Sequence, residues 1–242
     1  MSGDAETTPD AEGRRFRQFI PRPLSAAPGG PAPWSAMASA ERRPIALQRA
    51  IGSLEGVVAP AGAPDVRPTA AVLVPLFERD GEATTVLIRR SLVLMRNPGD
   101  LAFPGGALEP GEHPVHAALR EAHEEVGLRP GSVSVLGRLA TVSRAIGSEL
   151  VVPYVGILAG EPELRPQPAE VDAVLLVGLA DLAADGSYWE EEWTIPGQGS
   201  RRLPFFAHPQ ALGDDVIWGM TAMVIRELLS AVLAPGERSG FA

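Results

Sequence analysis

The sequence predicts a single domain of the mixed α/β class, preceded by an N-terminal extension, and three observations support this. Two runs of β-branched and aliphatic residues flank Asp80-Gly81, a typical hairpin turn. Apolar residues recur at helical spacing between residues 114 and 126, and again from about Val216 onward. Strands mixed with amphipathic helices are typical of a sheet that is covered by helices.

The extension is expected to comprise residues 1–40, which are rich in Pro, Gly and Ala and contain few aliphatic residues that a core could bury. We expect it to be partly disordered or loosely docked. It could pack on its own domain or on a second subunit, which leaves a homodimer open. The domain itself is expected over residues 41–238, and its first helix carries Leu47, Ala50, Ile51 and Leu54 on one stripe.

The remaining elements follow from alternating and helical patterns. Further strands are predicted in residues 132–142, 150–158 and 171–179, and a second hairpin is predicted where residues 191–197 and 201–206 flank Gly-Gln-Gly-Ser. A closing helix is expected from about Val216. Asp214 or Asp215 is available to cap its N-terminus.

Composition excludes several classes of function. The formal net charge of -9 over 242 residues argues against a general binder of nucleic acid or of anionic membranes. The chain has no cysteine, which excludes a disulfide framework, a thiolate zinc site and a cysteine nucleophile. No apolar run is long enough to span a membrane, and the N-terminus lacks a hydrophobic signal core. We therefore expect a cytoplasmic protein.

A cluster of glutamates is the most informative feature. The predicted helix starts at Pro114 and ends before Gly127, and its apolar face leaves Glu121, Glu124 and Glu125 together on one flank. Carboxylates about 5–6 Å apart repel each other by about 3 kcal/mol at an effective dielectric of about 20. Such a cluster calls for a cation, and Mg²⁺ is typically held by a few carboxylates together with substrate phosphates.

The residues from Gly106 to Leu128 resemble the Nudix box. Gly106, Glu112 and the run Arg120-Glu121-Ala122-His123-Glu124-Glu125-Val126-Gly127-Leu128 occupy its characteristic positions. The resemblance implies an α/β/α sandwich with a loop-helix-loop catalytic motif. It also implies hydrolysis of a nucleoside diphosphate linked to another moiety, with Mg²⁺ or Mn²⁺ bound by the box helix.

A second stretch, Leu87 to Gly106, resembles the additional signature of coenzyme A diphosphatases, which are a subfamily of Nudix hydrolases. The matching residues are Arg90, Ser91, Arg96, Gly99, Phe103, Pro104, Gly105 and Gly106. Two positions depart from the pattern: Ile88 stands where a threonine is frequent, and an arginine frequent at Met95 is displaced to Arg96. These departures bear on the substrate more than on the reaction.

The resemblance assigns roles by position. Glu121 and Glu125 would be metal ligands, and Glu124 would be a further ligand or the base that activates water. Arg120 would pair with a glutamate, in first place Glu112, and hold the loop against the helix. Glu170 is a candidate base from a later loop, with a loop-cap role as the alternative.

Substrate contacts are expected from cationic side chains and from the glycine loop. Arg89, Arg90 and Arg96 could meet phosphates, because guanidinium groups bind phosphate oxygens in a bidentate manner. Ser91, Gly105 and Gly106 complete the expected substrate-binding set. The small-molecule nucleotide would be coenzyme A or a derivative, and the products would be (acyl-)phosphopantetheine and adenosine 3′,5′-bisphosphate.

Two other hypotheses remain at this stage. One is a Nudix pyrophosphatase that acts on ADP-ribose, a dinucleotide or a damaged nucleotide. The other is a Nudix-fold binding module without turnover, which the intact set of box glutamates and Arg120 disfavours.

Overall fold

The helices and strands of the structure follow the alternation predicted from the sequence. The computed structural model describes residues 18–62, 64, 67–143, 149–195, 197 and 199–234. Its helices are α1 Leu47–Glu55, α2 Pro114–Val126, α3 Leu179–Leu182, α4 Pro209–Leu212 and α5 Gly219–Leu233, with short 3-10 turns at η1 Ser39–Glu41 and η2 Pro130–Ser132. Its strands are β1 Ala27–Pro28, β2 Ala70–Arg79, β3 Glu82–Arg90, β4 Leu101–Ala102, β5 Gly105–Ala107, β6 Ser134–Arg138, β7 Val142–Ser143, β8 Leu150–Ile157, β9 Val171–Gly178, β10 Tyr188–Ile195 and β11 Gly199–Phe206.

The central layer is an eight-stranded mixed sheet with the core order β4-β3-β2-β8-β6, to which β5, β7 and β9 add at the sides. Strands β2 and β8 run parallel, whereas β2 and β3 form an antiparallel hairpin. Leu73 and Phe77 of β2 face α2, and Val74 and Leu76 face the opposite side, so the strand is buried on both faces. This explains its almost continuous apolar sequence.

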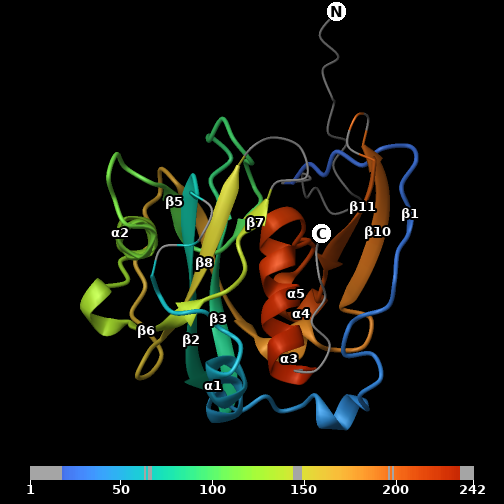
Figure 1. Cartoon of the computed structure of the whole chain (residues 1–242), viewed down its shortest axis with the longest axis horizontal. Coiled ribbons are helices and arrows are strands. Elements are labelled where there is room, and N and C mark those ends of the chain that lie inside the picture. The colour runs from blue at the N-terminus through green and yellow to red at the C-terminus, as the bar shows by residue number, and fades with distance from the viewer. Residues whose placement is uncertain are drawn as a thin grey trace, which may run out of the picture.

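Helices cover both faces of the sheet (Figure 1). Helix α2 packs on one face through small residues, Ala117, Ala118 and Ala122. Helices α1 and α5 share a core on the other face. The fold is therefore a mixed α/β sandwich, as expected. A second sheet, in the order β1-β10-β11, lies beyond α5. Among the described residues, no helix combines the length and the apolar character that crossing a bilayer requires.

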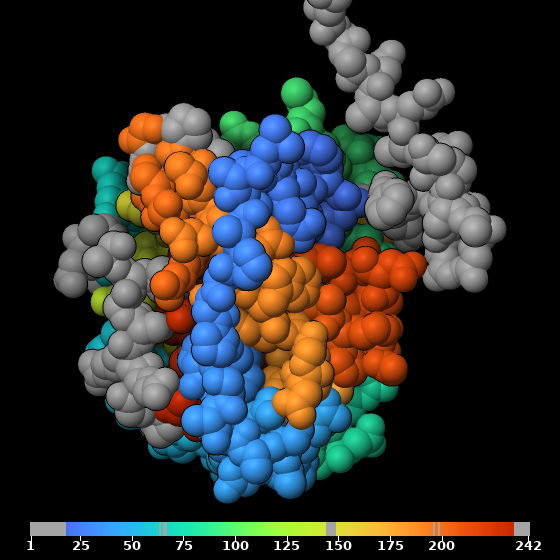
Figure 2. Space-filling view, turned by 90° about the vertical axis from the view of Figure 1, so that its right-hand side faces the viewer, coloured from blue at the N-terminus to red at the C-terminus, as the bar shows by residue number. Residues whose placement is uncertain are grey.

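Residues 18–41 lie along this second sheet, and Figure 2 shows the segment running across the surface of the molecule. Ala27–Pro28 pairs with β10, and Trp34 is only 1% exposed within the main core. The boundary expected at residue 40 remains a prediction, but Trp34 belongs to the core of the domain. Residues 1–17 lie outside the described residues.

Both predicted hairpins are present. Asp80 and Gly81 have positive φ angles of 53° and 80°, which is the conformation of a tight turn between β2 and β3. Strands β10 and β11 pair from Tyr188↔Phe206 to Ile195↔Gly199. These turns were predictable because their geometry depends on neighbouring residues alone.

The start of the closing helix differs from the prediction. Helix α5 begins at Gly219 rather than at Val216, and Trp218 precedes it without a side-chain cap. Ile217 instead exchanges two backbone hydrogen bonds with Phe206, of 2.8 and 2.9 Å, which keeps this segment extended. Asp215 does not cap the helix either, because its carboxylate pairs with Arg89.

Candidate active site

Helix α2 presents its glutamates to the loop that precedes it, and its boundaries are those expected. Pro114 is the first helical residue, and Gly127 ends the helix with a left-handed φ of 73°. Its contacts with β2 and β5 fix the rotation of the helix. The acidic flank therefore faces the segment Gly105–Ala107.

Glu125 is buried rather than lying on an open flank, with 2% of its surface exposed. Its Oε2 atom accepts a hydrogen bond of 2.9 Å from the backbone amide of Gly105, and its Oε1 atom lies 4.0 Å from Nη1 of Arg90. Burial raises the pKa of Glu125 to about 7, although the amide and Arg90 act in the opposite direction. A nearby cation would favour the carboxylate form of this side chain.

The carboxylate of Glu121 lies directly on the backbone of Gly106. A Cβ atom at position 106 would be 2.5 Å from Cδ of Glu121 and 2.6 Å from both oxygens. Gly105 is similarly constrained, because its φ is 154° and a Cβ atom would come within 2.4 Å of the carbonyl oxygen of Ala71. Burial raises the pKa of Glu121, although Arg120 acts in the opposite direction. Gly106 thus allows a close approach of the loop to α2, and Gly105 allows a close approach of the loop to β2.

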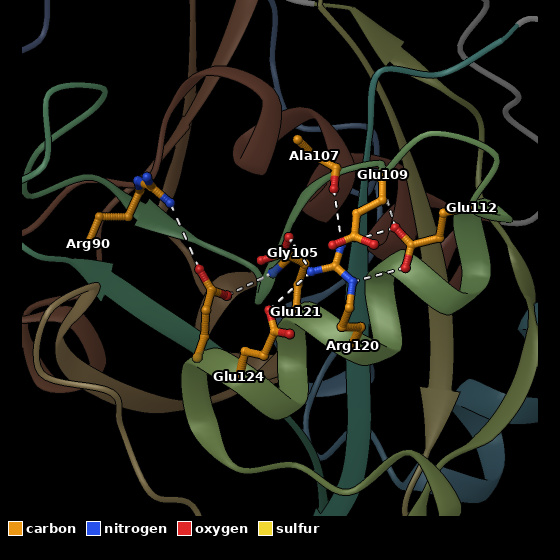
Figure 3. A network of polar contacts seen from close by, with 9 residues as sticks. Arg90, Gly105, Ala107, Glu109, Glu112, Arg120, Glu121 and Glu124 are labelled. Atoms are coloured by element: carbon orange, nitrogen blue, oxygen red, sulfur yellow. Dashed lines mark hydrogen bonds and ion pairs between the residues drawn. The ribbon is translucent and has the colours of Figure 1, made fainter.

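Arg120 connects the loop to the helix through the contacts seen in Figure 3. Its Nε and Nη2 atoms bind the two oxygens of Glu112 at 2.9 and 3.0 Å, which is the expected pairing. Its Nη1 atom binds Glu121 at 2.9 Å and Glu124 at 3.0 Å, and Nη2 also donates to the carbonyl of Ala107 at 3.2 Å. The hydrogen bond from Arg120 lowers the pKa of Glu112.

The charges of this group do not balance. Four glutamates, at positions 112, 121, 124 and 125, face two arginines, at positions 90 and 120. Among the described residues no three acidic or histidine side chains converge into a ready metal cage. Arg120 binds three of the four carboxylates, and the amide of Gly105 binds the fourth. Carboxylate oxygens are the ligands that Mg²⁺ and Mn²⁺ prefer, so the donor set fits a hard divalent cation.

The last two residues of β3 are both arginines, and their side chains point to opposite faces of the sheet. Arg90 faces α2 and Glu125, and its Nε atom is buried without a hydrogen-bond partner among the described residues. Arg89 points away from the glutamates and pairs with Asp215 and, at 3.4 Å, with Asp172. Successive strand residues alternate in direction, so the sequence pair Arg89-Arg90 could not supply two phosphate ligands at one place.

The other expected substrate contacts lie on loops beside this group. Ser91 is buried and donates its backbone amide to the carbonyl of Glu170 at 2.8 Å, so the two loops are joined. The side chain of Glu170 is exposed, and its charge contributes to the raised pKa of both Glu121 and Glu125. Arg96 is exposed on the loop after β3. The roles assigned to these residues stay predictions.

Two features of the site were not predicted from the sequence. The first is the burial of Glu125, although its position three residues after Ala122 on the apolar stripe was a signal for it. The engagement of Arg89 by Asp215 joins residues 126 positions apart, and no local pattern signals such a pair.

The fold and the site together define a class, the hydrolases of pyrophosphate bonds. A family model described as the NUDIX domain matches residues 67–195, which is more than half of the chain. The chain therefore belongs to the Nudix family and is a Nudix hydrolase. Members of this family act on small nucleotide substrates and generally use divalent metal ions.

Two relatives illustrate the similarity. An uncharacterized Nudix hydrolase, NudL of Photorhabdus laumondii, is 38% identical over 164 residues, covering 67% of this chain and 84% of that protein. The human mitochondrial coenzyme A diphosphatase NUDT8 is 37% identical over 171 residues, covering 69% of this chain and 70% of that protein. Among solved structures, a MutT/nudix family protein from Enterococcus faecalis aligns with a TM-score of 0.48 and 20% identity, over 82% of this chain and 75% of its own.

Proposed function

We propose that the protein hydrolyses the diphosphate bond of coenzyme A or of its acyl derivatives, giving (acyl-)phosphopantetheine and adenosine 3′,5′-bisphosphate. The observation that carries this proposal is the position of Arg90, which faces Glu125 and whose buried Nε atom has no hydrogen-bond partner in the part of the chain that the structure describes. A guanidinium beside acidic metal ligands is suited to a phosphate oxygen. The similarity to the human coenzyme A diphosphatase supports the same substrate class.

Glu121, Glu124 and Glu125 would hold Mg²⁺ or Mn²⁺. When bound, such an ion neutralises charge on the diphosphate and favours deprotonation of the attacking water. Arg120 orients Glu121 and Glu124 and ties them to Glu112, so that the acidic group keeps its geometry. Glu124 or Glu170 would accept the proton of water, since both carboxylates are accessible to solvent.

Arg90 and Ser91 would position the substrate at the mouth of this group. The backbone hydrogen bond from Ser91 to Glu170 joins the binding loop to the loop that carries the candidate base. Arg96, which is exposed, would meet a phosphate that lies farther out. The net charge of -9 makes such local cations necessary for an anionic substrate.

A substrate panel tests the proposal. Coenzyme A, an acyl-coenzyme A, ADP-ribose, NADH and an oxidised deoxynucleotide are each supplied with Mg²⁺, with Mn²⁺ and with excess chelator. We expect the highest kcat/KM for a coenzyme A form and loss of turnover in chelator. If ADP-ribose or a deoxynucleotide is the best substrate, the substrate assignment is wrong.

A matched pair of variants tests the mechanism. We expect Glu125→Gln to lower kcat by more than about a hundredfold, since even residues that only orient metal ligands contribute 10–100-fold. Glu163→Gln makes the same chemical change at a side chain that is 94% exposed, and it should behave as the wild type. Turnover by Glu125→Gln at the wild-type rate would exclude this glutamate from the chemistry.

The cytoplasmic location and the homodimer stay predictions. The human relative is described as mitochondrial, so similarity to it does not support a cytoplasmic location. Sedimentation of the purified chain over a concentration series would settle its assembly.

A further inference from the structure

The loop of residues 91–99, which follows β3, is closed by a short neck. The amide of Arg90 donates to the carbonyl of Asp100 at 3.0 Å, and the amide of Gly99 donates to the carbonyl of Arg90 at 3.0 Å. Beyond the neck, β3 and β4 pair at Ile88↔Ala102 and Arg89↔Leu101. The direction of Arg90 and Ser91 into the site thus depends on the geometry of this neck.

Side chains from distant parts of the chain bind the neck from outside. The Oδ1 atom of Asp100 accepts a hydrogen bond of 3.0 Å from Nε1 of Trp218 and one of 3.1 Å from Nε2 of Gln18. One residue along β3 from Arg90, Arg89 pairs with Asp215, and their side chains are only 16% and 10% exposed. We call Gln18, Arg89, Asp100, Asp215 and Trp218 the neck clamp.

Gln18 connects two parts of the clamp. Its Nε2 atom donates to the carbonyl of Val216 at 2.8 Å, and its Oε1 atom accepts from the amide of Val216 at 3.2 Å. The same amide group therefore pairs with the backbone before α5 and with the carboxylate of the neck. A primary amide suits this position because it supplies donors and an acceptor at once.

The hydrogen bonds and ion pairs given above for the neck clamp involve none of the four glutamates at positions 112, 121, 124 and 125. Arg89 points to the face of the sheet opposite Glu125, and the other members of the clamp come from the N-terminal segment, from the neck and from the segment before α5. Gln18, Asp215 and Trp218 also lie outside residues 67–195, the part of the chain that matches the family model. Residues from both flanking regions of this chain thus contact the neck of the loop that follows Arg90.

We propose that the neck clamp is a positioning device for substrate binding: Gln18 and Trp218 hold Asp100 so that Arg90 and Ser91 keep their direction into the site. This inference rests on the proposed function for the identity of the bound substrate. Loosening the clamp should weaken substrate binding, whereas Arg120 keeps its hydrogen bonds to the acidic side chains and Glu125 keeps the hydrogen bond from the amide of Gly105. The expected signature is a raised KM with kcat preserved.

The test exchanges the polar groups of Gln18 and Asp100. Gln18→Glu replaces the donor by a carboxylate, which faces Asp100 across a contact of 3.1 Å in the wild type and also loses the hydrogen bond to the carbonyl of Val216. We expect KM to rise about tenfold, with kcat within about twofold of the wild type. The double variant Gln18→Glu with Asp100→Asn again pairs one amide with one carboxylate at the neck but does not restore the hydrogen bond to Val216, so KM should return to within about threefold of the wild type rather than fully.

Two further variants keep the test sharp. Trp218→Phe removes the indole donor but retains an aromatic ring, and we expect a KM increase of about fivefold. Gln48→Glu makes the same change as Gln18→Glu on an exposed position of α1, and it should leave KM unchanged. Thermal unfolding of each variant shows whether it is folded under the assay conditions.

The outcomes separate the two proposals. If the wild type hydrolyses coenzyme A but Gln18→Glu and Trp218→Phe, both folded, keep the wild-type KM, the neck clamp has no positioning role. A fall in kcat at unchanged KM would also overturn it. If another nucleotide proves to be the substrate, the proposed function fails, and the same KM and kcat comparison on that nucleotide decides the clamp.

Discussion

Replacing Gly106 by alanine should lower the activity and leave the free energy of unfolding nearly unchanged. The new Cβ atom would lie 2.5 Å from Cδ of Glu121, whereas ordinary van der Waals contacts at this position begin near 3.4 Å. The carboxylate must therefore move by about 1 Å, and a misplacement of this size can reduce a rate about a hundredfold. Gly106 does not have a positive φ, so its backbone accommodates alanine, and Glu121 can yield because its carboxylate ends a flexible side chain.

The assay measures kcat/KM together with the dependence of the rate on Mg²⁺ or Mn²⁺ concentration. We expect Gly106→Ala to lower kcat/KM by about a hundredfold and to require more metal, while its free energy of unfolding changes by less than about 1 kcal/mol. Gly131→Ala is the control, because nothing lies within 4 Å of its added Cβ atom. A Gly106→Ala enzyme with wild-type kcat/KM and metal dependence would refute the placement of Glu121 against Gly106.

Two other expectations follow from single contacts. Arg120→Lys keeps a positive charge but cannot bind both oxygens of Glu112, so kcat/KM should fall about 10–100-fold. The control Arg165→Lys changes an exposed side chain and should have no effect. If Arg120→Lys is as active as the wild type, the guanidinium has no such role. Burial raises the pKa of Glu227, which accepts a hydrogen bond of 2.8 Å from the amide of Ala140. The folded protein therefore binds this proton more tightly than the unfolded chain does, and stability is lost as the pH rises through the folded pKa. Glu227→Gln keeps the acceptor, so its Tm should exceed that of the wild type near pH 8 and match it near pH 4. An equal difference in Tm at both pH values would show that the titration of Glu227 is not the cause.

The parts of the fold that depend on neighbouring residues were predictable from the sequence. Pro114, Gly127 and the apolar spacing between them define α2 locally, and Asp80-Gly81 defines its hairpin in the same way. The start of α5 was not predictable, because Ile217 is held extended by Phe206 from β11. Local composition also describes residues 18–40 poorly, since a single tryptophan, Trp34, inserts into the core.

In the candidate site, too, contacts between residues near in sequence were predictable and contacts across the fold were not. The pairing of Arg120 with Glu112 spans eight residues and was anticipated from the motif. The opposite directions of Arg89 and Arg90 follow from strand alternation once it is known that β3 extends through Arg90. That Arg89 would meet Asp215 depends on a contact across the fold, which periodicity cannot reveal.

The parallel pairing of β2 with β8 has a consequence for synthesis of the chain. Thr69, which directly precedes β2, and Leu150, the first residue of β8, are 81 residues apart, and the whole of α2 lies between them. A nascent chain therefore completes its acidic helix while one edge of β2 still lacks its neighbour. Strand edges of this kind invite pairing with other chains, and non-local pairing is slow to form. A ribosomal pause before β8 emerges would thus prolong a stage at which this edge of β2 is open to pairing with other chains.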